Sequence, residues 1–314
     1  MRHNYKGKFM YDIIVIGGGP AGLTAALYAR RANKSVLVIE KATFGGQITF
    51  SPKVENIAGF TEISGNEFAE KAVDQVLSQG AEFEACEVTA IEDGDIKRVI
   101  TDDGVFECRA VIIATGAKHR LMGIEGEKKL IGNGISFCAV CDGAFYRGKT
   151  VGVVGGGNSA LQEALLLSEL AEKVFVIQNL ETLTGERRLA EQLESRENVE
   201  ILLGRTVCTV KGGEYLTGIT VKNEKSGELQ SIDIDGLFVA IGLVPQNEPF
   251  DGLIKLNEYG YALSDENCGT AAKGVFVAGD CRTKRVRQVA TAVSDGAVAA
   301  LAACEYIDEN FCSA

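Results

Sequence analysis

The stretch from Phe137 to Tyr146 reads FCAVCDGAFY and holds the clearest chemistry in the chain. Cys138 and Cys141 are separated by two residues, and Asp142 follows at once. Such a pair beside a βαβ segment is typical of a redox dithiol, because the short loop can close a disulfide and a positive local potential lowers the pKa of a thiol. A buried acid beside it can hold the proton that a leaving thiolate needs. The sequence leaves open that Asp142 only closes a turn before a glycine.

The same pair of cysteines is also compatible with half of a zinc site. A complete site needs two more nitrogen or sulfur ligands at suitable spacing. The chain has only two histidines, no second C-x-x-C and no H-x-x-H. We therefore expect a redox pair and no metal.

A segment of the chain is repeated. YDIIVIGGGPAGLTAALYARRANKSVLVIE (Tyr11–Glu40) and KTVGVVGGGNSALQEALLLSELAEKVFVIQ (Lys149–Gln178) each run from an apolar strand through a glycine turn into an alanine- or leucine-rich helix and a second apolar strand. In a G-x-G-x-x-G/A turn, the first position permits the tight turn, the second lets a pyrophosphate approach, and the third packs helix on strand. The positions are Gly17, Gly19 and Gly22 in the first copy and Gly155, Gly157 and Ala160 in the second.

Two further features, one at the end of the first copy and one far along the chain, indicate FAD. Glu40 ends its second strand, where an acid accepts hydrogen bonds from ribose hydroxyls that carry no 2′-phosphate, so the first copy suits FAD or NAD. Far along the chain, GVFVAGDC (Gly274–Cys281) reads as a buried strand that ends in Gly279-Asp280 and precedes an alanine-rich helix. Such a carboxylate can hold a ribityl hydroxyl, and the N-terminus of the helix can face the polar edge of a flavin.

These patterns predict an α/β fold of two Rossmann-like domains of the three-layer ββα type, the second inserted into the first. We expect residues 1–117 and 246–314 to form a discontinuous FAD-binding domain. Residues 118–245 then form an NAD(P)H-type domain that carries the dithiol.

The bulk properties exclude some classes of function. The 314 residues carry a net charge of −11, which disfavours binding to nucleic acid. No uninterrupted apolar run of membrane-spanning length occurs, and the apolar run after Met10 reads as a strand entering a glycine turn. We expect a cytoplasmic protein that does not cross a membrane.

Taken together, the motifs resemble the low-molecular-weight thioredoxin reductase family over nearly the whole chain. The matching pieces, in chain order, are GGGPAG (17–22), GGQI (45–48), VENIAGF (54–60), ATGA (114–117), CAVCDG (138–143), GGGNSA (155–160) and GVFVAGDC with RQVATAVSDGAVAA (274–300). The resemblance implies bound FAD, a homodimer, and a dithiol that passes electrons to thioredoxin.

The resemblance also implies roles for individual residues. Cys141 would take electrons from the flavin, Cys138 would attack the partner disulfide, and Asp142 would be the acid. The positions that match FAD contacts are Gly17, Gly19, Pro20, Ala21, Gly22, Glu40, Gly46, Gln47, Asn56, Thr115, Gly116, Gly279, Asp280, Arg287, Gln288 and Val289.

The chain departs from this family at the end of the second copy. Members that use NADPH have a His-Arg-Arg run there, and another arginine four positions later, to bind the 2′-phosphate. Here the aligned residues are Gln178, Asn179, Leu180 and Thr184, and Glu181 adds a negative charge. Gln178 is also not the acid that would favour NADH. We therefore expect a donor other than NADPH.

Several donors stay open on the sequence. The chain resembles most the ferredoxin-linked branch, which does not use pyridine nucleotides, so reduced ferredoxin is the expected donor. NADH or NADPH at an unusual site, a deazaflavin, and the reverse reaction of an FAD-dependent oxidase of small dithiols are the alternatives, as is a flavin-binding sensor. Because ferredoxins are acidic, docking would need a basic patch, for which Lys284 and Arg285 are the candidates.

Overall fold

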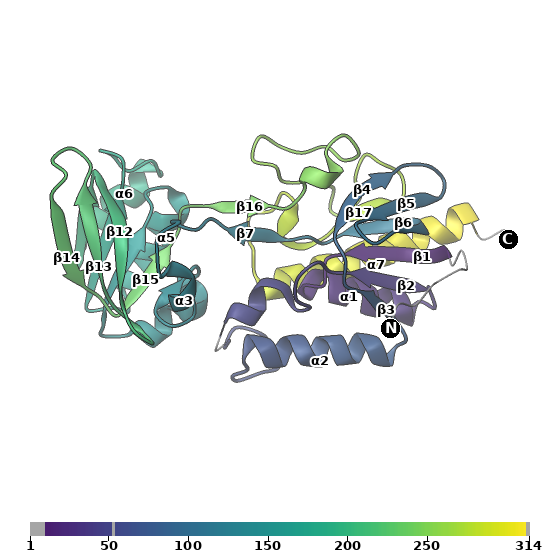
Figure 1. Cartoon of the computed structure of the whole chain (residues 1–314), viewed down its shortest axis with the longest axis horizontal. Helices are drawn as coiled ribbons and strands as arrows, with labels where there is room; N and C mark the ends of the chain where they lie inside the picture. The colour runs from purple at the N-terminus through teal and green to yellow at the C-terminus, as the bar shows by residue number, and fades with distance from the viewer. Residues whose placement is uncertain (1–9, 52–53, 312–314) are drawn as a thin grey trace. The chain divides into compact units, whose positions relative to one another are not determined.

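The computed structural model describes residues 10–51 and 54–311, which fall into two compact units. Of these, residues 10–51, 57–118 and 244–311 form the first unit, and residues 54–56 and 119–243 form the second. Two short strands, β7 (Ala117–His119) and β16 (Leu243–Pro245), carry the chain from one unit to the other and pair as a two-stranded sheet (Figure 1). The sequence placed the corresponding boundaries at residues 117/118 and 245/246.

The first unit is built on a sheet of seven strands. Their order is β3 (Glu82–Glu84), β2 (Val36–Ile39), β1 (Met10–Ile16), β6 (Val105–Ile113), β5 (Lys97–Thr101) and β4 (Val88–Glu92), with β17 (Val275–Val277) also paired to β6. The strands around β1 are parallel, whereas β4, β5 and β6 pair antiparallel. The residues of β2 and β17 are buried throughout, as expected for parallel strands covered on both faces.

Helices cover one face of this sheet. They are α1 (Pro20–Arg31), α2 (Gly65–Ser78) and α7 (Val289–Phe311), with the short 3₁₀ turns η1 (Gly46–Phe50), η3 (Glu248–Phe250) and η4 (Gly279–Cys281) in the loops. One apolar core lies between the sheet and α1 and α7, and a second lies on the other face. The α7 helix is long and apolar enough to cross a membrane by length and composition, but eight of its residues are buried in the first unit, which accounts for its apolar composition.

The second unit repeats this plan on a smaller scale. Its parallel sheet has the order β11 (Val199–Leu203), β10 (Lys173–Gln178), β9 (Thr150–Val154), β15 (Gly236–Val239) and β8 (Ile135–Ser136). A separate antiparallel sheet contains β12 (Arg205–Gly212), β13 (Leu216–Asn223) and β14 (Leu229–Asp233). The helices are α3 (Glu127–Leu130), α4 (Ala139–Asp142), α5 (Asn158–Ser168) and α6 (Arg187–Glu194), with the 3₁₀ turn η2 (Gly143–Tyr146). The α/β class and the two βαβ segments, β1-α1-β2 and β9-α5-β10, are confirmed.

The first glycine of each turn allows two strand ends to come into contact. Gly17 has φ +111° and Gly155 has φ +131°, a region that side chains strongly disfavour. A Cβ on Gly17 would lie 2.3 Å from the carbonyl oxygen of Ala114, and one on Gly155 would lie 2.6 Å from that of Ala240. Ala114 follows β6 and Ala240 follows β15, the strand next to the turn in each unit. In both units, therefore, a side chain at the first glycine would collide with the end of the neighbouring strand.

The contact between α1 and α7 depends on a second kind of glycine. A Cβ on Gly296 in α7 would lie 2.2 Å from the carbonyl oxygen of Ala21 in α1, so no side chain fits between the two helices. Because backbone cannot yield as a flexible side chain does, we expect Gly296→Ala to lower the free energy of unfolding by about 2 kcal/mol or more. Leu301→Ala, on the exposed face of the same helix, is the control and should change it by less than about 0.5 kcal/mol. Equal effects of the two substitutions in thermal or denaturant unfolding would contradict this close packing.

Candidate active site

The two cysteines form a disulfide at the start of a very short helix. The Cα atoms of Cys138 and Cys141 are 5.3 Å apart, and Cys138 is the N-cap of α4. Its sulfur accepts the backbone N–H of Cys141 at 3.2 Å, and its carbonyl oxygen accepts that of Asp142 at 3.0 Å. The loop is therefore closed by backbone bonds as well as by the disulfide, and Val140 at its tip is exposed.

Asp142 is held in a protonatable state by its surroundings. Burial raises the pKa of this carboxyl, and the hydroxyl of Ser136, which donates to Oδ2 at 2.6 Å, offsets part of that rise. Oδ1 is buried with no hydrogen-bond partner in the described part of the chain. The Ser136 oxygen also accepts the backbone N–H of Cys138 at 3.1 Å, which links the acid to the first cysteine. This arrangement fits a proton donor better than a turn aspartate.

Aromatic side chains lie next to the cysteine loop. His119 stacks on Phe137 with ring centroids 4.5 Å apart, and burial lowers the pKa of His119 to about 4. Burial, with Asp142 and Asp235, raises the pKa of Tyr146 to about 12. Both side chains are therefore neutral at neutral pH.

Two residues of this site escaped the sequence analysis. Ser136 ends β8 and binds Asp142, and Glu163 on α5 contacts the cysteine loop. Ser136 could have been noticed as a hydroxyl two residues before a reactive cysteine. Nothing in the helical pattern of α5 distinguishes Glu163 from its exposed neighbours, because its surroundings come from packing against a distant loop.

The first glycine turn lies at the N-terminus of α1 and is open at its second glycine. Nothing lies closer than 4.0 Å to a Cβ built on Gly19, whereas one on Gly22 would lie 1.9 Å from the carbonyl oxygen of Gly17. Pro20 and Ala21 begin the helix. Glu40 accepts the backbone N–H of Gly18 through Oε2 at 2.7 Å, which holds the acid against the turn. The geometry fits a dinucleotide approaching Gly19.

Asp280 brings a buried carboxylate to the same region. It follows β17, and its Oδ1 is buried without a partner among the described residues. Burial raises its pKa, which Lys284 and Arg287 partly offset. Gly279 has φ +81°, and a Cβ there would lie 2.8 Å from that of Ala21. An orphaned acceptor that close to a phosphate-binding turn fits a ligand with hydroxyl groups between them.

The other predicted cofactor positions lie in the loops around these two. Arg287 lies over the Tyr261 ring at 4.2 Å, Gln288 precedes α7, and Val289 begins it. Thr115 and Gly116 follow β6, and the hydroxyl of Thr115 lies 3.3 Å from Asn247. Gly46 and Gln47 begin η1. Asn56 belongs by its contacts to the second unit, where its Nδ2 is 4.0 Å from Cys141 Sγ. The FAD contacts of these residues stay predictions.

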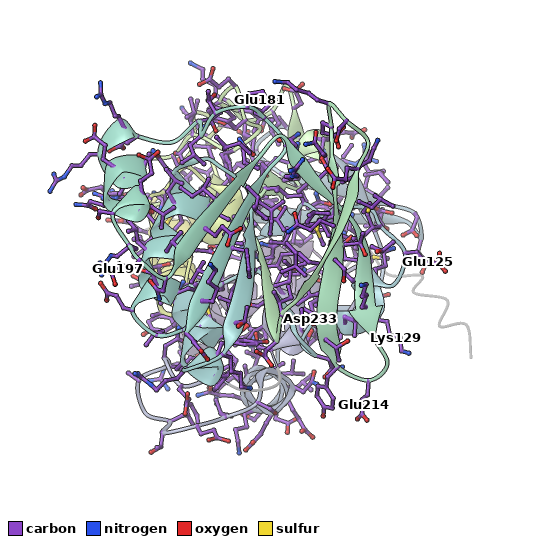
Figure 2. All side chains as sticks on the ribbon, turned by 90° about the vertical axis from the view of Figure 1, so that its left-hand side faces the viewer. Glu125, Lys129, Glu181, Glu197, Glu214 and Asp233 are labelled. Carbon is purple, nitrogen blue, oxygen red and sulfur yellow. A yellow bond between two sulfur atoms is a disulfide. The ribbon has the colours of Figure 1, made fainter. Side chains whose placement is uncertain are left out.

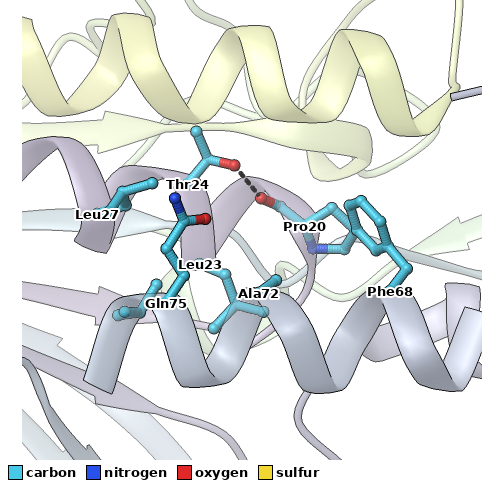
Figure 3. Close-up of a pocket in the computed structure, with 8 residues that line it drawn as sticks. Pro20, Leu23, Thr24, Leu27, Phe68, Ala72 and Gln75 are labelled. Atoms are coloured by element: carbon cyan, nitrogen blue, oxygen red, sulfur yellow. Dashed lines mark hydrogen bonds between the residues drawn. The ribbon is translucent and has the colours of Figure 1, made fainter. Parts of the chain in front are cut away.

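One small pocket begins at Pro20, beside the first glycine turn. Figure 3 shows it between α1 and α2, with the hydroxyl of Thr24 bonded to the carbonyl oxygen of Pro20. Its volume is about 30 Å³, which is too small for a nucleotide. It does not extend the site.

The strand end in the second unit differs from that in the first. Gln178 is buried, its amide donates to the carbonyl oxygen of Thr182 at 3.3 Å, and a Cβ on Gly156 would lie 2.5 Å from its Nε2. Glu181 pairs with Lys225 at 3.0 Å. Arg187, at the start of α6, pairs with Glu191 and is almost fully exposed. The side chains at this strand end thus satisfy one another instead of forming a phosphate clamp.

Comparisons with known proteins give the family. The model of the pyridine nucleotide-disulphide oxidoreductases matches residues 11–296. A "34.2 kDa protein in rubredoxin operon" from Clostridium pasteurianum is 42% identical over 96% of this chain and 99% of its own length. A thioredoxin reductase from Treponema pallidum is 41% identical over 95% of this chain and 97% of its own. The crystal structure of a thioredoxin reductase from Streptococcus pyogenes superposes with a TM-score of 0.92 at 37% identity, over 96% of this chain and 100% of that one.

The fold and the disulfide site together define a flavin-dependent disulfide oxidoreductase. The chain belongs to the pyridine nucleotide-disulphide oxidoreductase family, and within it to the low-molecular-weight thioredoxin reductases, whose members bind FAD. The open turn at Gly19, Glu40 and the orphaned carboxylate of Asp280 fit that cofactor, which supplies a carrier that takes up and releases two electrons.

The orphaned carboxylate can be tested through cofactor retention. We expect Asp280→Ala to weaken FAD binding about tenfold or more, because a buried acceptor for a ligand hydroxyl is lost. The stability of the cofactor-free protein should not fall, since the substitution removes a carboxylate that is costly to bury. Flavin content after dialysis and thermal unfolding of the apoprotein measure the two effects, with the exposed Asp251→Ala as control. Full flavin retention in Asp280→Ala would exclude a contact between Asp280 and the cofactor.

Proposed function

We propose that this chain is an FAD-dependent thioredoxin-disulfide reductase whose electron donor is reduced ferredoxin rather than NADPH. The observation that carries the reductase activity is the Cys138–Cys141 disulfide beside a buried, protonatable Asp142. We further propose that the enzyme is a cytoplasmic homodimer. In this proposal, residues 1–117 and 246–314 bind FAD and residues 118–245 carry the dithiol.

The cysteines transfer electrons in two exchanges. Bound FAD would supply the two electrons that cleave the Cys138–Cys141 bond. One proton from Asp142 converts one of the two sulfurs to a thiol, while the other stays a thiolate. Cys138 then attacks the disulfide of thioredoxin, which forms a mixed disulfide and releases one thioredoxin sulfur. Attack by Cys141 on Cys138 frees reduced thioredoxin and restores the original disulfide.

The choice of donor rests on the second glycine turn. The chain lacks the arginines that clamp a 2′-phosphate, and Gln178 and Glu181 bond to Thr182 and Lys225. Bidentate arginines contribute much of the affinity for a phosphate, so their loss disfavours NADPH. The relative described by its place in a rubredoxin operon supports a one-electron iron protein as the donor.

Of the two basic residues expected to dock an acidic donor, only Arg285 is exposed. The side chain of Lys284 is only 10% exposed and pairs with Asp295 at 2.8 Å, so it is poorly placed to dock a partner. Arg285 is exposed and keeps that candidacy. Figure 2 labels Glu125, Glu197 and Lys129 on the side of the second unit that faces the viewer, together with Glu181, which pairs with Lys225.

A second candidate donor is NADH or NADPH bound without the usual clamp. It is favoured by the geometry of the second turn, where Gly155 keeps its positive φ and nothing lies closer than 3.9 Å to a Cβ on Gly157. A pyrophosphate can therefore still approach the turn.

The donor is tested by mixing the oxidised protein anaerobically with NADPH, NADH or reduced ferredoxin and following the flavin band near ~450 nm. We expect rapid bleaching with ferredoxin alone. In the double variant Asn179→Arg/Leu180→Arg, the rate with NADPH should rise about tenfold or more, because two cations are restored at the strand end. The matched control Arg187→Ala should leave all three rates unchanged, since this arginine pairs with Glu191. Rapid bleaching of the wild-type protein by NADPH or NADH would refute the ferredoxin assignment.

The order of the cysteines is tested by trapping. We expect Cys141→Ser to accumulate a mixed disulfide with thioredoxin through Cys138, because the resolving thiol is gone. Cys138→Ser should accumulate none. Non-reducing electrophoresis and mass spectrometry of the adduct measure the outcome, and the reverse pattern would exchange the two roles.

A further inference from the structure

Asp295, in the second turn of α7, accepts three hydrogen bonds from the loop that carries Asp280. Its Oδ2 accepts the backbone N–H of Gly279 at 3.0 Å and the ammonium group of Lys284 at 2.8 Å. Its Oδ1 accepts Nη1–H of Arg282 at 3.1 Å. All three donors lie between β17 and α7. One carboxylate on the helix therefore ties down most of this loop.

Arg282 extends this network to a third segment of the chain. Its Nε donates to the hydroxyl of Ser264 at 2.7 Å, and its Nη2 donates to the carbonyl oxygen of Asp265 at 2.9 Å. The side chains of Asp295, Arg282 and Lys284 are only 13%, 14% and 10% exposed. Charges removed from water to this extent seldom add stability over apolar side chains of similar size. A role in fixing geometry accounts for the network better than a gain in stability does.

Gly279 connects the network with the first glycine turn. It has φ +81°, and a Cβ built on it would lie 2.8 Å from the Cβ of Ala21, at the start of α1. Because Asp295 accepts the N–H of Gly279, it holds the loop at this close contact. The distance between the loop and the glycine turn is therefore set by a buried hydrogen bond.

The same turn of chain is also held at its other end. Gly279, Asp280 and Cys281 form η4, and Nδ2 of the buried Asn247 donates to the carbonyl oxygen of Cys281 at 2.8 Å. Asp280 lies between this anchor and the one at Gly279. Its Oδ1, which is buried without a partner among the described residues, thus leaves the backbone at a point that is fixed on both sides.

We infer that Asp295 is a positioning residue of the cofactor site, which holds the loop from Gly279 to Lys284 so that the carboxylate of Asp280 is in place before FAD binds. A loop that is already ordered does not have to be ordered by the ligand, which lowers the cost of binding. The inference rests on the proposed contact between Asp280 and FAD. It depends neither on the electron donor nor on the dithiol chemistry.

The test is a double-mutant cycle on FAD affinity. Holoenzyme is dialysed against a series of FAD concentrations, and the flavin retained per chain gives the Kd. Asp295→Asn keeps the shape of the side chain and an oxygen for Gly279 but withdraws the charge from the two cations. We expect it to raise the Kd about tenfold, because hydrogen bonds to charged groups are lost and the loop moves. Added to Asp280→Ala, the same substitution should raise the Kd by less than about twofold, since Asp295 acts through Asp280.

A spectroscopic measurement separates positioning from a general effect on the fold. In Asp295→Asn saturated with FAD, the visible circular dichroism of the flavin should differ from that of the wild type, because the ligand hydroxyl meets a displaced carboxylate. Glu305→Gln removes a charge from the exposed face of the same helix and should leave the Kd and the spectrum unchanged. Arg282→Met is a second variant, which unties the loop but leaves Asp295 paired with Lys284. Its effect on the Kd should also disappear in the Asp280→Ala background.

Two results would overturn the inference. One is a wild-type Kd in Asp295→Asn, and the other is a rise by the same factor with and without Asp280, since a purely structural residue would weaken binding equally in both backgrounds. Wild-type affinity in Asp280→Ala would remove the contact on which the inference rests. The proposed reductase activity would be unaffected by that result, because the trapping of thioredoxin tests it separately.

Discussion

The close approach of backbone at the two glycine turns is the constraint on which the rest of the structure depends. Gly17 and Gly155 place a strand end within contact of a neighbouring carbonyl oxygen, which a side chain would prevent. The helix that follows each turn then packs directly on its strands. In the first unit this creates an opening at Gly19, and in the second it sets α5, with Glu163, against the cysteine loop.

The two units have kept the same turn but use the residue at the end of the second strand differently. Glu40 accepts the backbone N–H of Gly18 in its turn, and in the proposed FAD site its carboxylate would face a ribose. Gln178 occupies the same place and is buried, with its amide bonded to Thr182. Since helix packing alone requires the turn, its persistence in the second unit does not require a bound nucleotide there.

The dithiol site combines an exposed cysteine loop with buried carboxyl groups. Val140 is exposed at the tip of the loop, whereas Oδ1 of Asp142 and Oε2 of Glu163 are buried. Burial raises the pKa of both Asp142 and Glu163, because water that would solvate their charges is excluded. In the proposed mechanism, a carboxyl rather than a histidine supplies the proton. The only histidine among the described residues, His119, is neutral.

Much of this protein follows from the sequence by itself. The glycine spacings, the apolar strands and the C-x-x-C-D motif are local patterns, and they predicted the α/β class, the repeated βαβ segment, the cofactor and the family. Tertiary structure alone decided which distant groups meet. Ser136 and Glu163 join the cysteine loop, Asp280 is left as a buried acceptor near Ala21, and Lys284 is taken out of solvent by Asp295. The reason is physical: burial and pairing depend on contacts between elements far apart in the chain, and no residue pattern of period 2 or 3.6 records them.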